Sequence, residues 1–151
     1  MKHALHSHCG GDKILPVALQ KEIVTAIAAI TIRPAVGAAA KMRDAFLVNL
    51  KGSGWSSEVF VSRDSDMTIT SLKNGVGLCL QTGNMARIYA DLIKLQAMYL
   101  DNSINSAAIV LPSHPLAKQL GSNIAQAKRL ERELEILKKA YHVPTLVFAL
   151  E

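Results

Sequence analysis

An Asn-Gly dipeptide at positions 74 and 75 is the feature that most constrains the fold of this chain. It lies between two runs of alternating apolar residues, within the segment ITSLKNGVGLCLQTGN of residues 69–84. Asn-Gly between two such runs is the strongest short-range indication of a β-hairpin, because both residues tolerate the positive φ angles of a two-residue turn. The sequence therefore predicts paired strands at about residues 67–72 and 76–81.

The spacing of apolar residues elsewhere predicts four helices and three further strands. The helices are expected at residues 16–30, 38–50, 84–100 and 127–137, and the strands at 58–62, 107–111 and 145–150. Residues 107–111 (AAIVL) form a short continuous apolar run, which is typical of a buried central strand. With no repeat and no internal boundary, residues 1–151 are expected to form one α/β domain, a mixed sheet flanked by helices.

The composition of the chain excludes only a few classes of protein. Half of the 151 residues are hydrophobic and 19% are charged, which is typical of a globular protein rather than a disordered one. The formal charge of +5 is compatible with a polyanion as partner without being specific for one. Two cysteines, Cys9 and Cys79, suggest no disulfide framework and favour a reducing cytoplasm. No apolar run approaches the ~20 residues that span a bilayer.

Several short strings, in their order and spacing, resemble type II restriction endonucleases of the Bgl and BstY group, in the PD-(D/E)xK nuclease superfamily. The strings are Ser7-His8 with Gly11, Gly54-Trp55, Lys73-Asn74, Gln81, Gly83-Asn84, GSNIA at 121–125 and RLERELEIL at 129–137. The resemblance covers nearly the whole chain. It implies a restriction-endonuclease-like α/β fold, Mg²⁺-dependent hydrolysis of double-stranded DNA and a homodimer suited to a palindromic site.

The chain departs from that pattern at both acidic positions of the hairpin. The resemblance implies that Thr70, Cys79 and Gln81 occupy the catalytic positions, but the group has Asp at the first and Glu at the second. Phosphodiester hydrolysis uses Mg²⁺ to neutralise charge and to generate hydroxide, and Mg²⁺ prefers carboxylate oxygens. A Thr hydroxyl is a weaker, neutral ligand, and a Cys thiolate is soft and suits zinc. An impaired or lost cleavage centre is therefore expected.

Three acidic residues are candidates to replace the missing carboxylates. Asp91 follows the hairpin on the next predicted helix and is the best placed of them. Glu22 lies on the first predicted helix, where nucleases of this fold often carry an acid, and Asp66 lies on the same strand face as Thr70. If one of them restores the site, Mg²⁺ is the expected cofactor; otherwise no cofactor is expected.

Contacts with DNA are expected from Asn84, Ser122 and Asn123, which match positions at the major groove in the group that the chain resembles. Amide and hydroxyl groups read base edges, and Asn pairs well with adenine. Capping of the helices that follow is an equally weighted alternative for Asn84 and Asn123.

Three other groups of residues have simpler interpretations that we favour. His3, His6, His8 and Cys9 could form a zinc site, but a solvated terminal segment is the simpler reading. Cys79 could be a nucleophile, but no base is visible beside it and a buried strand cysteine is favoured. The charge run at 128–139 could face DNA, but its mixed signs favour a solvated helix face.

Three hypotheses for function follow. The first is a DNA-binding restriction endonuclease homologue with an impaired or lost cleavage centre. The second is an active endonuclease whose acidic residues have migrated. The third is a non-catalytic interaction protein that keeps the same scaffold, because a fold does not by itself determine a function.

Overall fold

The apolar run near residue 107 forms the middle strand of a five-stranded sheet, as predicted. β6 (Ser106–Pro112) is buried along its whole length, and the computed structural model, which describes residues 1–151, gives the strand order β1-β7-β6-β5-β4. β5 (Val76–Leu80) and β7 (Thr145–Leu150) pair with β6 in parallel. β4 (Ser71–Lys73) and β1 (His3–His8) are antiparallel edge strands. The predicted mixed sheet is confirmed.

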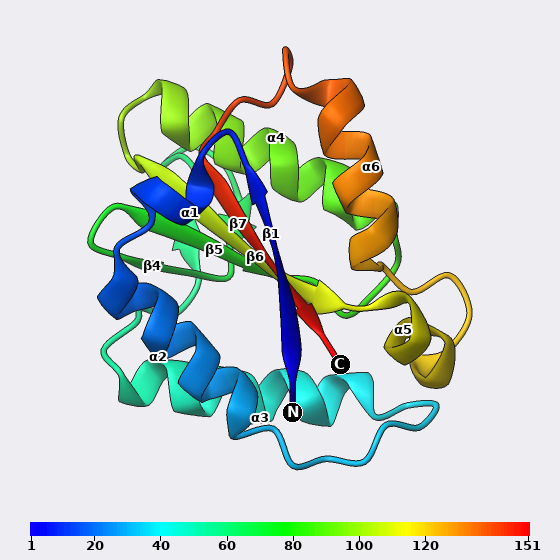
Figure 1. Ribbon diagram of the computed structural model, residues 1–151. Helices are drawn as coiled ribbons and strands as arrows, with labels where there is room; N and C mark the ends of the chain where they lie inside the picture. The colour runs from blue at the N-terminus through cyan, green and yellow to red at the C-terminus, as the bar shows by residue number, and fades with distance from the viewer.

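Helices cover both faces of this sheet, because its central strands present apolar side chains on both sides. α2 (Val17–Ala28), α3 (Ala39–Gly52) and the short α5 (His114–Leu120) pack on one face. α4 (Arg87–Leu100) and α6 (Ala127–Leu137) pack on the other, and Figure 1 shows the sheet between the two groups. All four predicted helices are present; α5 and α1 (Gly11–Ile14) were not expected. None of the helices combines the length and apolar character needed to cross a membrane.

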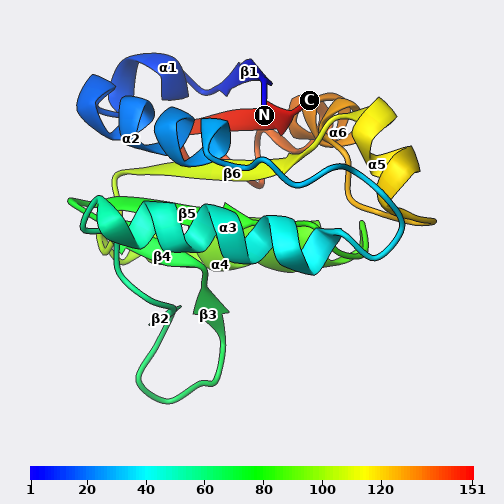
Figure 2. The same ribbon diagram turned by 90° about the horizontal axis from the view of Figure 1, so that it is seen from below.

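The predicted hairpin forms at Asn74-Gly75, where both residues have positive φ angles of 47° and 77°. These angles are those of the two-residue turn that matches the twist of paired strands, and Lys73 faces Val76 across it. The first predicted strand, however, is interrupted at Thr70. Its earlier part, β3 (Thr68–Ile69), leaves the main sheet and pairs with β2 (Val59–Phe60) in a separate ribbon that projects from the molecule in Figure 2.

The interpretation of the first residues as a solvated tail is wrong, because β1 pairs with β7 over six residues. His8 is buried and its Nε2 lies 2.8 Å from the carbonyl oxygen of Tyr141. Gly11 lies against the backbone of Thr145, where a Cβ would come within 2.2 Å of that backbone. The polar composition of β1 reflects its place at the sheet edge, where backbone pairing rather than burial of side chains holds the strand.

An ion pair anchors the hairpin to the helices on the α2 face. Lys73 Nζ donates to both carboxylate oxygens of Glu22, at 2.8 Å each, and to the carbonyl oxygen of Ser53. Trp55 Nε1 donates to the same carboxylate at 2.8 Å. The side chains of Lys73 and Glu22 are only 20% and 28% exposed. These contacts connect β4 with α2 and with the segment after α3, so they hold the hairpin in place.

We predict that Lys73→Met lowers the free energy of unfolding by about 1–2 kcal/mol at pH 7, because it leaves a partly buried carboxylate without its charged partner. Urea denaturation followed by far-ultraviolet circular dichroism measures this loss. Lys51→Met is the matched control, since Lys51 is an exposed lysine of α3 that makes no ion pair. An equal effect of both substitutions would contradict the anchoring role.

The same contact predicts a pH dependence. The Lys73 hydrogen bond, helped by Trp55, holds the pKa of Glu22 below its ordinary value of 4.5. A carboxylate with a lowered pKa stabilises the fold above its ordinary pKa and loses this contribution as pH falls through its folded-state value. The stability difference between the wild type and Lys73→Met should therefore be full near neutral pH and shrink below pH 4.5.

Candidate functional site

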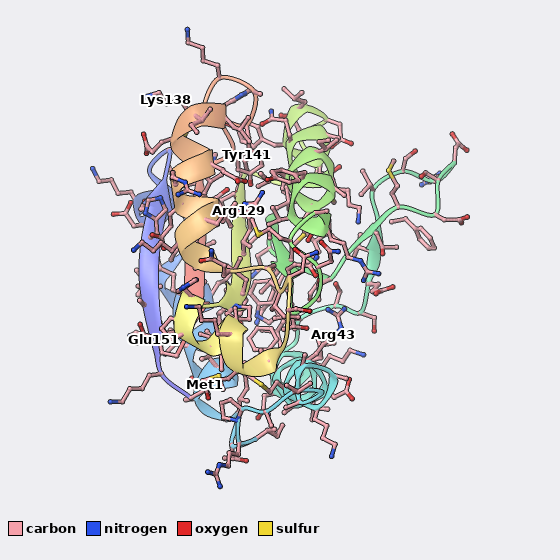
Figure 3. The ribbon with its side chains drawn as sticks, turned by 90° about the vertical axis from the view of Figure 1, so that its right-hand side faces the viewer. Met1, Arg43, Arg129, Lys138, Tyr141 and Glu151 are labelled. Carbon is pink, nitrogen blue, oxygen red and sulfur yellow. The ribbon has the colours of Figure 1, made fainter.

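A cleft of about 680 Å³ opens where β5 ends, between α3, the β2–β3 ribbon and the first turns of α4. Parallel strands commonly place ligand sites at their carboxyl ends, because the loops that follow diverge there. The polar and charged lining residues come from all of these elements: Arg43, Glu58, Thr68, Thr70, Gln81, Thr82, Arg87, Asp91 and Lys94. In Figure 3, Arg43 marks the α3 side of this region.

The strand register brings Thr70 and Cys79 together. The ladder of the hairpin ends at the pair of Ser71 with Leu78, and Thr70, one residue beyond it, still lies beside the Cys79 thiol. Thr70 lines the cleft, and its Oγ1 accepts a hydrogen bond of 3.0 Å from the Leu80 amide. Its hydroxyl oxygen is therefore engaged by a backbone amide at the point where β3 separates from β4.

Cys79 is buried with only 1% of its surface exposed, and it packs in the core under α4. Burial raises the pKa of its thiol far above the ordinary value of 9.0, and the nearby Asp91 carboxylate adds to the shift. The thiol is therefore neutral near pH 7. Since the thiolate is both the nucleophile and the metal ligand, the favoured interpretation as a buried strand cysteine is the one that this geometry supports.

Gln81 and Asp91 form the polar centre of the cleft. Gln81 Nε2 donates to Asp91 Oδ2 at 2.9 Å, while its Oε1 accepts from the Gly83 amide at 3.1 Å. Lys94 Nζ lies 3.6 Å from the other Asp91 oxygen. Burial raises the pKa of the Asp91 carboxyl above its ordinary value, against the opposing effects of Gln81 and Lys94. Asp91 is thus the one buried carboxyl group of the cleft.

The other two candidate acids do not line the cleft. Glu22 is held by Lys73 and Trp55 on the opposite side of the hairpin, so its carboxylate is already engaged. Asp66 lies in the exposed loop between β2 and β3. The expectation that Asp66 shares a strand face with Thr70 is wrong, because the strand breaks at Thr70 and its earlier part joins a different sheet.

Sequence reasoning missed four charged residues of the cleft, namely Arg43, Glu58, Arg87 and Lys94. Arg43 Nη1 donates to the Leu80 carbonyl oxygen at 3.0 Å, and its Nη2 lies 4.0 Å from Glu58. Arg43 is next to the apolar stripe of α3, and nothing in its local pattern indicates that α3 crosses the end of β5. Lys94 could have been found, because its spacing of three residues from Asp91 is that of a helical ion pair.

The donor groups of the cleft do not fit a Mg²⁺ ion. This cation is usually bound by one or two carboxylates that keep free oxygens for it. Both Asp91 oxygens already face protein partners, Gln81 and Lys94, and Glu58 is an exposed residue beside Arg43. No group of three or more His, Cys, Asp or Glu side chains is placed to hold a metal ion, and this includes the histidines and Cys9 near the first residue.

The three residues expected to contact DNA lie on two loops that touch each other. Asn84 forms an antiparallel bridge with Ile124, the Met85 amide donates to the Asn123 carbonyl at 3.1 Å, and the Ala125 amide donates to Gly83. Ser122 follows on the same loop, and the side chains of Asn84, Ser122 and Asn123 are exposed. The structure therefore brings together two segments that are about 40 residues apart in the sequence.

Neither asparagine caps the helix that follows it, because the N-cap of α4 is Ala86 and that of α6 is Gln126. Asn84 Oδ1 accepts from the Ala86 amide at 2.8 Å, which stabilises the turn just before α4. The capping alternative for Asn123 is wrong, because Gln126 accepts from the Arg129 amide and caps α6. Asn123 instead has a left-handed backbone, with φ of 56°.

A polar groove lies beside these loops, and we call it the basic groove. It consists of two adjoining hollows of about 220 and 230 Å³ that share His114, Gln126 and Arg129. Lys118, Lys128 and Arg132 complete its cationic lining. Arg129 pairs with Glu133 at 2.7 Å and Lys138 with Glu135 at 4.0 Å, so the expected pairs along α6 are confirmed. The loop of residues 81–85 separates the basic groove from the cleft.

Comparisons with known proteins agree with this arrangement. The family described as restriction endonuclease BglII/BglIII matches residues 3–150, and no curated protein matches the chain. A crystal structure of restriction endonuclease BglII complexed with a DNA 16-mer superposes with a TM-score of 0.85, at 16% identity, over 99% of this chain and 76% of that one. Free BglII superposes with a TM-score of 0.73, at 17% identity, over 100% and 80%. The predicted fold is confirmed, and the chain belongs to the BglII/BglIII family of restriction endonucleases.

Proposed function

We propose that this chain is a DNA-binding type II restriction endonuclease homologue whose cleavage centre is impaired or lost. The observation that supports it most directly is the chemistry at the two hairpin positions where the family pattern has acids. Thr70 uses its hydroxyl to hold the Leu80 amide, and Cys79 is buried with a neutral thiol. Neither side chain supplies the negative charge that attracts a divalent cation.

The charge requirement of the reaction explains why this loss matters. Metal-assisted hydrolysis depends on a cation that neutralises the phosphate and lowers the pKa of its bound water. Magnesium, the metal on which this family of enzymes generally depends, needs carboxylate oxygens that are free to bind it. Asp91 is the only buried carboxyl group at the cleft, and it is engaged by Gln81 and Lys94.

An active enzyme with a migrated acid is the second candidate, and one observation favours it. Asp91 lines the cleft and bonds directly to Gln81, the residue at the third catalytic position. If a divalent cation replaced the Lys94 ammonium group beside the Asp91 carboxylate, that cation would lie within reach of a phosphate in the cleft. Mg²⁺ would be the cofactor in that case, and none would be needed otherwise.

Binding to double-stranded DNA is supported by the surface around both loops. The cationic lining of the basic groove suits the phosphate backbone, while the exposed amides of Asn84 and Asn123 and the hydroxyl of Ser122 suit base edges. The cleft and the groove adjoin the same loop, so one duplex can contact both. The net charge of +5 adds a general attraction for a polyanion.

A homodimer follows from the same proposal, because a two-fold symmetric protein suits a palindromic site. The surface that fits this role is the outer side of α4 with the end of α6. It carries an apolar hollow of about 480 Å³ that includes Leu92, Ile93 and Leu100. Ile93 and Leu100 are 70% and 66% exposed, which is unusual for a contiguous apolar surface without a partner.

Restoring the acids tests the cleavage centre. We expect Thr70→Asp with Cys79→Glu to gain Mg²⁺-dependent cleavage of plasmid DNA, because it returns two carboxylates to the cleft. Thr70→Asn with Cys79→Gln is the matched uncharged control and should stay inactive. Thermal denaturation must show that both double variants fold, since position 79 is buried. Site-specific cleavage by the wild type that is lost in Asp91→Asn would favour the second candidate instead.

Removing one amide tests the base contacts. We predict that Asn123→Gly broadens the range of sequences that the protein selects from a library of randomised duplexes. The discrimination between bases at the contacted position should fall by about 1–3 kcal/mol. Glycine keeps the left-handed backbone at this position, where φ is 56°. Arg132→Gln should instead weaken all duplexes alike and lower the salt dependence. DNA binding that does not weaken as salt rises would favour a non-catalytic interaction protein.

Charging the apolar surface tests the dimer. Ile93→Glu with Leu100→Glu should convert a dimer into a monomer in size-exclusion chromatography with light scattering, because two buried carboxylates would face their symmetry mates. Val48→Glu is the control for added surface charge, since Val48 is a 71% exposed residue of α3. A wild-type protein that remains monomeric when bound to a palindromic duplex would contradict this part of the proposal.

A further inference from the structure

The cleft at the end of β5 has more positive than negative charge. Its cationic side chains are Arg43, Arg87 and Lys94, and its carboxyl groups are those of Glu58 and Asp91. The excess is therefore one positive charge when both acids are ionised. A carboxylate at position 70, which lines the cleft, and one at position 79, which is buried behind it, would have turned this into an excess of one negative charge. The departure from the family pattern thus reverses the sign of the site.

Arg43 is held at the cleft with most of its donors free. Its guanidinium donates to the Leu80 carbonyl oxygen at 3.0 Å, which fixes it at the end of β5. Glu58 is 4.0 Å away and its side chain is 63% exposed, so this ion pair is weak in water. A guanidinium has five N–H donors in a planar fork, and Leu80 and Glu58 engage only part of this fork.

Arg87 and Lys94 add charge from the α4 side. The Arg87 side chain makes no hydrogen bond or ion pair within the protein, although it lines the cleft. Its Nη1 would lie 3.8 Å from a Cβ added to Gly83, so the missing side chain at Gly83 leaves room next to the guanidinium. Lys94 faces Asp91 at 3.6 Å, and burial raises the pKa of that carboxyl group above its ordinary value. Asp91 pairs with one of the three cations and the exposed Glu58 lies 4.0 Å from another, so one positive charge is left without a partner.

We propose that this cleft binds a phosphate group directly through Arg43, Arg87 and Lys94, with no divalent cation between them. Guanidinium groups suit phosphate because they donate two parallel hydrogen bonds to its oxygens, and a lysine adds a point charge. The inference rests on the proposed function where the phosphate belongs to DNA. A free phosphate ion has the same chemistry, and the experiment separates these two sources.

The test measures DNA binding in the presence of EDTA. The wild type should bind a short labelled duplex in fluorescence anisotropy, and Arg87→Gln should weaken this binding about fivefold or more. The salt dependence of Arg87→Gln should also fall by about one unit of slope, because one phosphate contact is lost. Lys138→Gln removes the same charge at the far end of the molecule from Arg43 (Figure 3) and should change the affinity by less than about twofold.

A second measurement identifies the source of the phosphate. Inorganic phosphate is titrated calorimetrically into the wild type and into Arg87→Gln, again with EDTA. Binding to the wild type that Arg87→Gln abolishes supports the site, even if no duplex binds, and only the proposed function would then fail. Loss of duplex affinity without binding of free phosphate supports the site with the DNA backbone as its source.

Three outcomes would overturn the inference. The first is that Arg87→Gln leaves unchanged every affinity, for duplex or for inorganic phosphate, that the wild type shows. The second is duplex binding that EDTA abolishes and Mg²⁺ restores, because the cleft would then depend on a cation. The third is a wild type that binds neither duplex nor inorganic phosphate.

Discussion

The pairing of β5 with β6 determines which way the side chains of β5 face where the cleft opens. The two strands run parallel over five residue pairs, and the Gln81 amide extends this ladder to the Val110 carbonyl oxygen at 2.9 Å. Side chains alternate along a strand, so this register sends Leu78 and Leu80 to one core and Cys79 to the other. A shift of one residue would exchange all of them, and the burial of both faces prevents it.

Burial at this position also explains the chemistry that remains. A carboxylate at position 79 would have to be stabilised by a cation, because an isolated charge in such surroundings is very costly. Cysteine needs no such partner and packs as a small apolar residue, with its thiol proton retained. Once neither hairpin position carries an acid, the arginines and the lysine around the cleft are no longer balanced. The loss of cation binding and the anion affinity that we propose would thus be two consequences of one change in charge.

Much of the fold could be predicted because its determinants are local. The Asn74-Gly75 turn, the apolar stripes of the four longer helices and the continuous apolar run of β6 each depend on residues close together in the sequence. The edge strand β1 could not be predicted in this way. Its residues are polar and largely exposed, and it is a strand only because β7, more than 130 residues away, offers backbone partners.

The candidate site, like the fold, could be predicted from the sequence only in part. The resemblance of short strings and the period of a strand determined that Thr70, Cys79 and Gln81 belong together and that acids are missing there. Only the tertiary structure decided that Asp91 lies in the cleft, that Glu22 is held by Lys73, and that Arg43 and Arg87 supply the dominant charge. The physical reason is that these residues meet through the packing of α3 and α4 against opposite faces of one sheet. Periodicity tells which side of a helix is buried, but not which strand end that helix crosses.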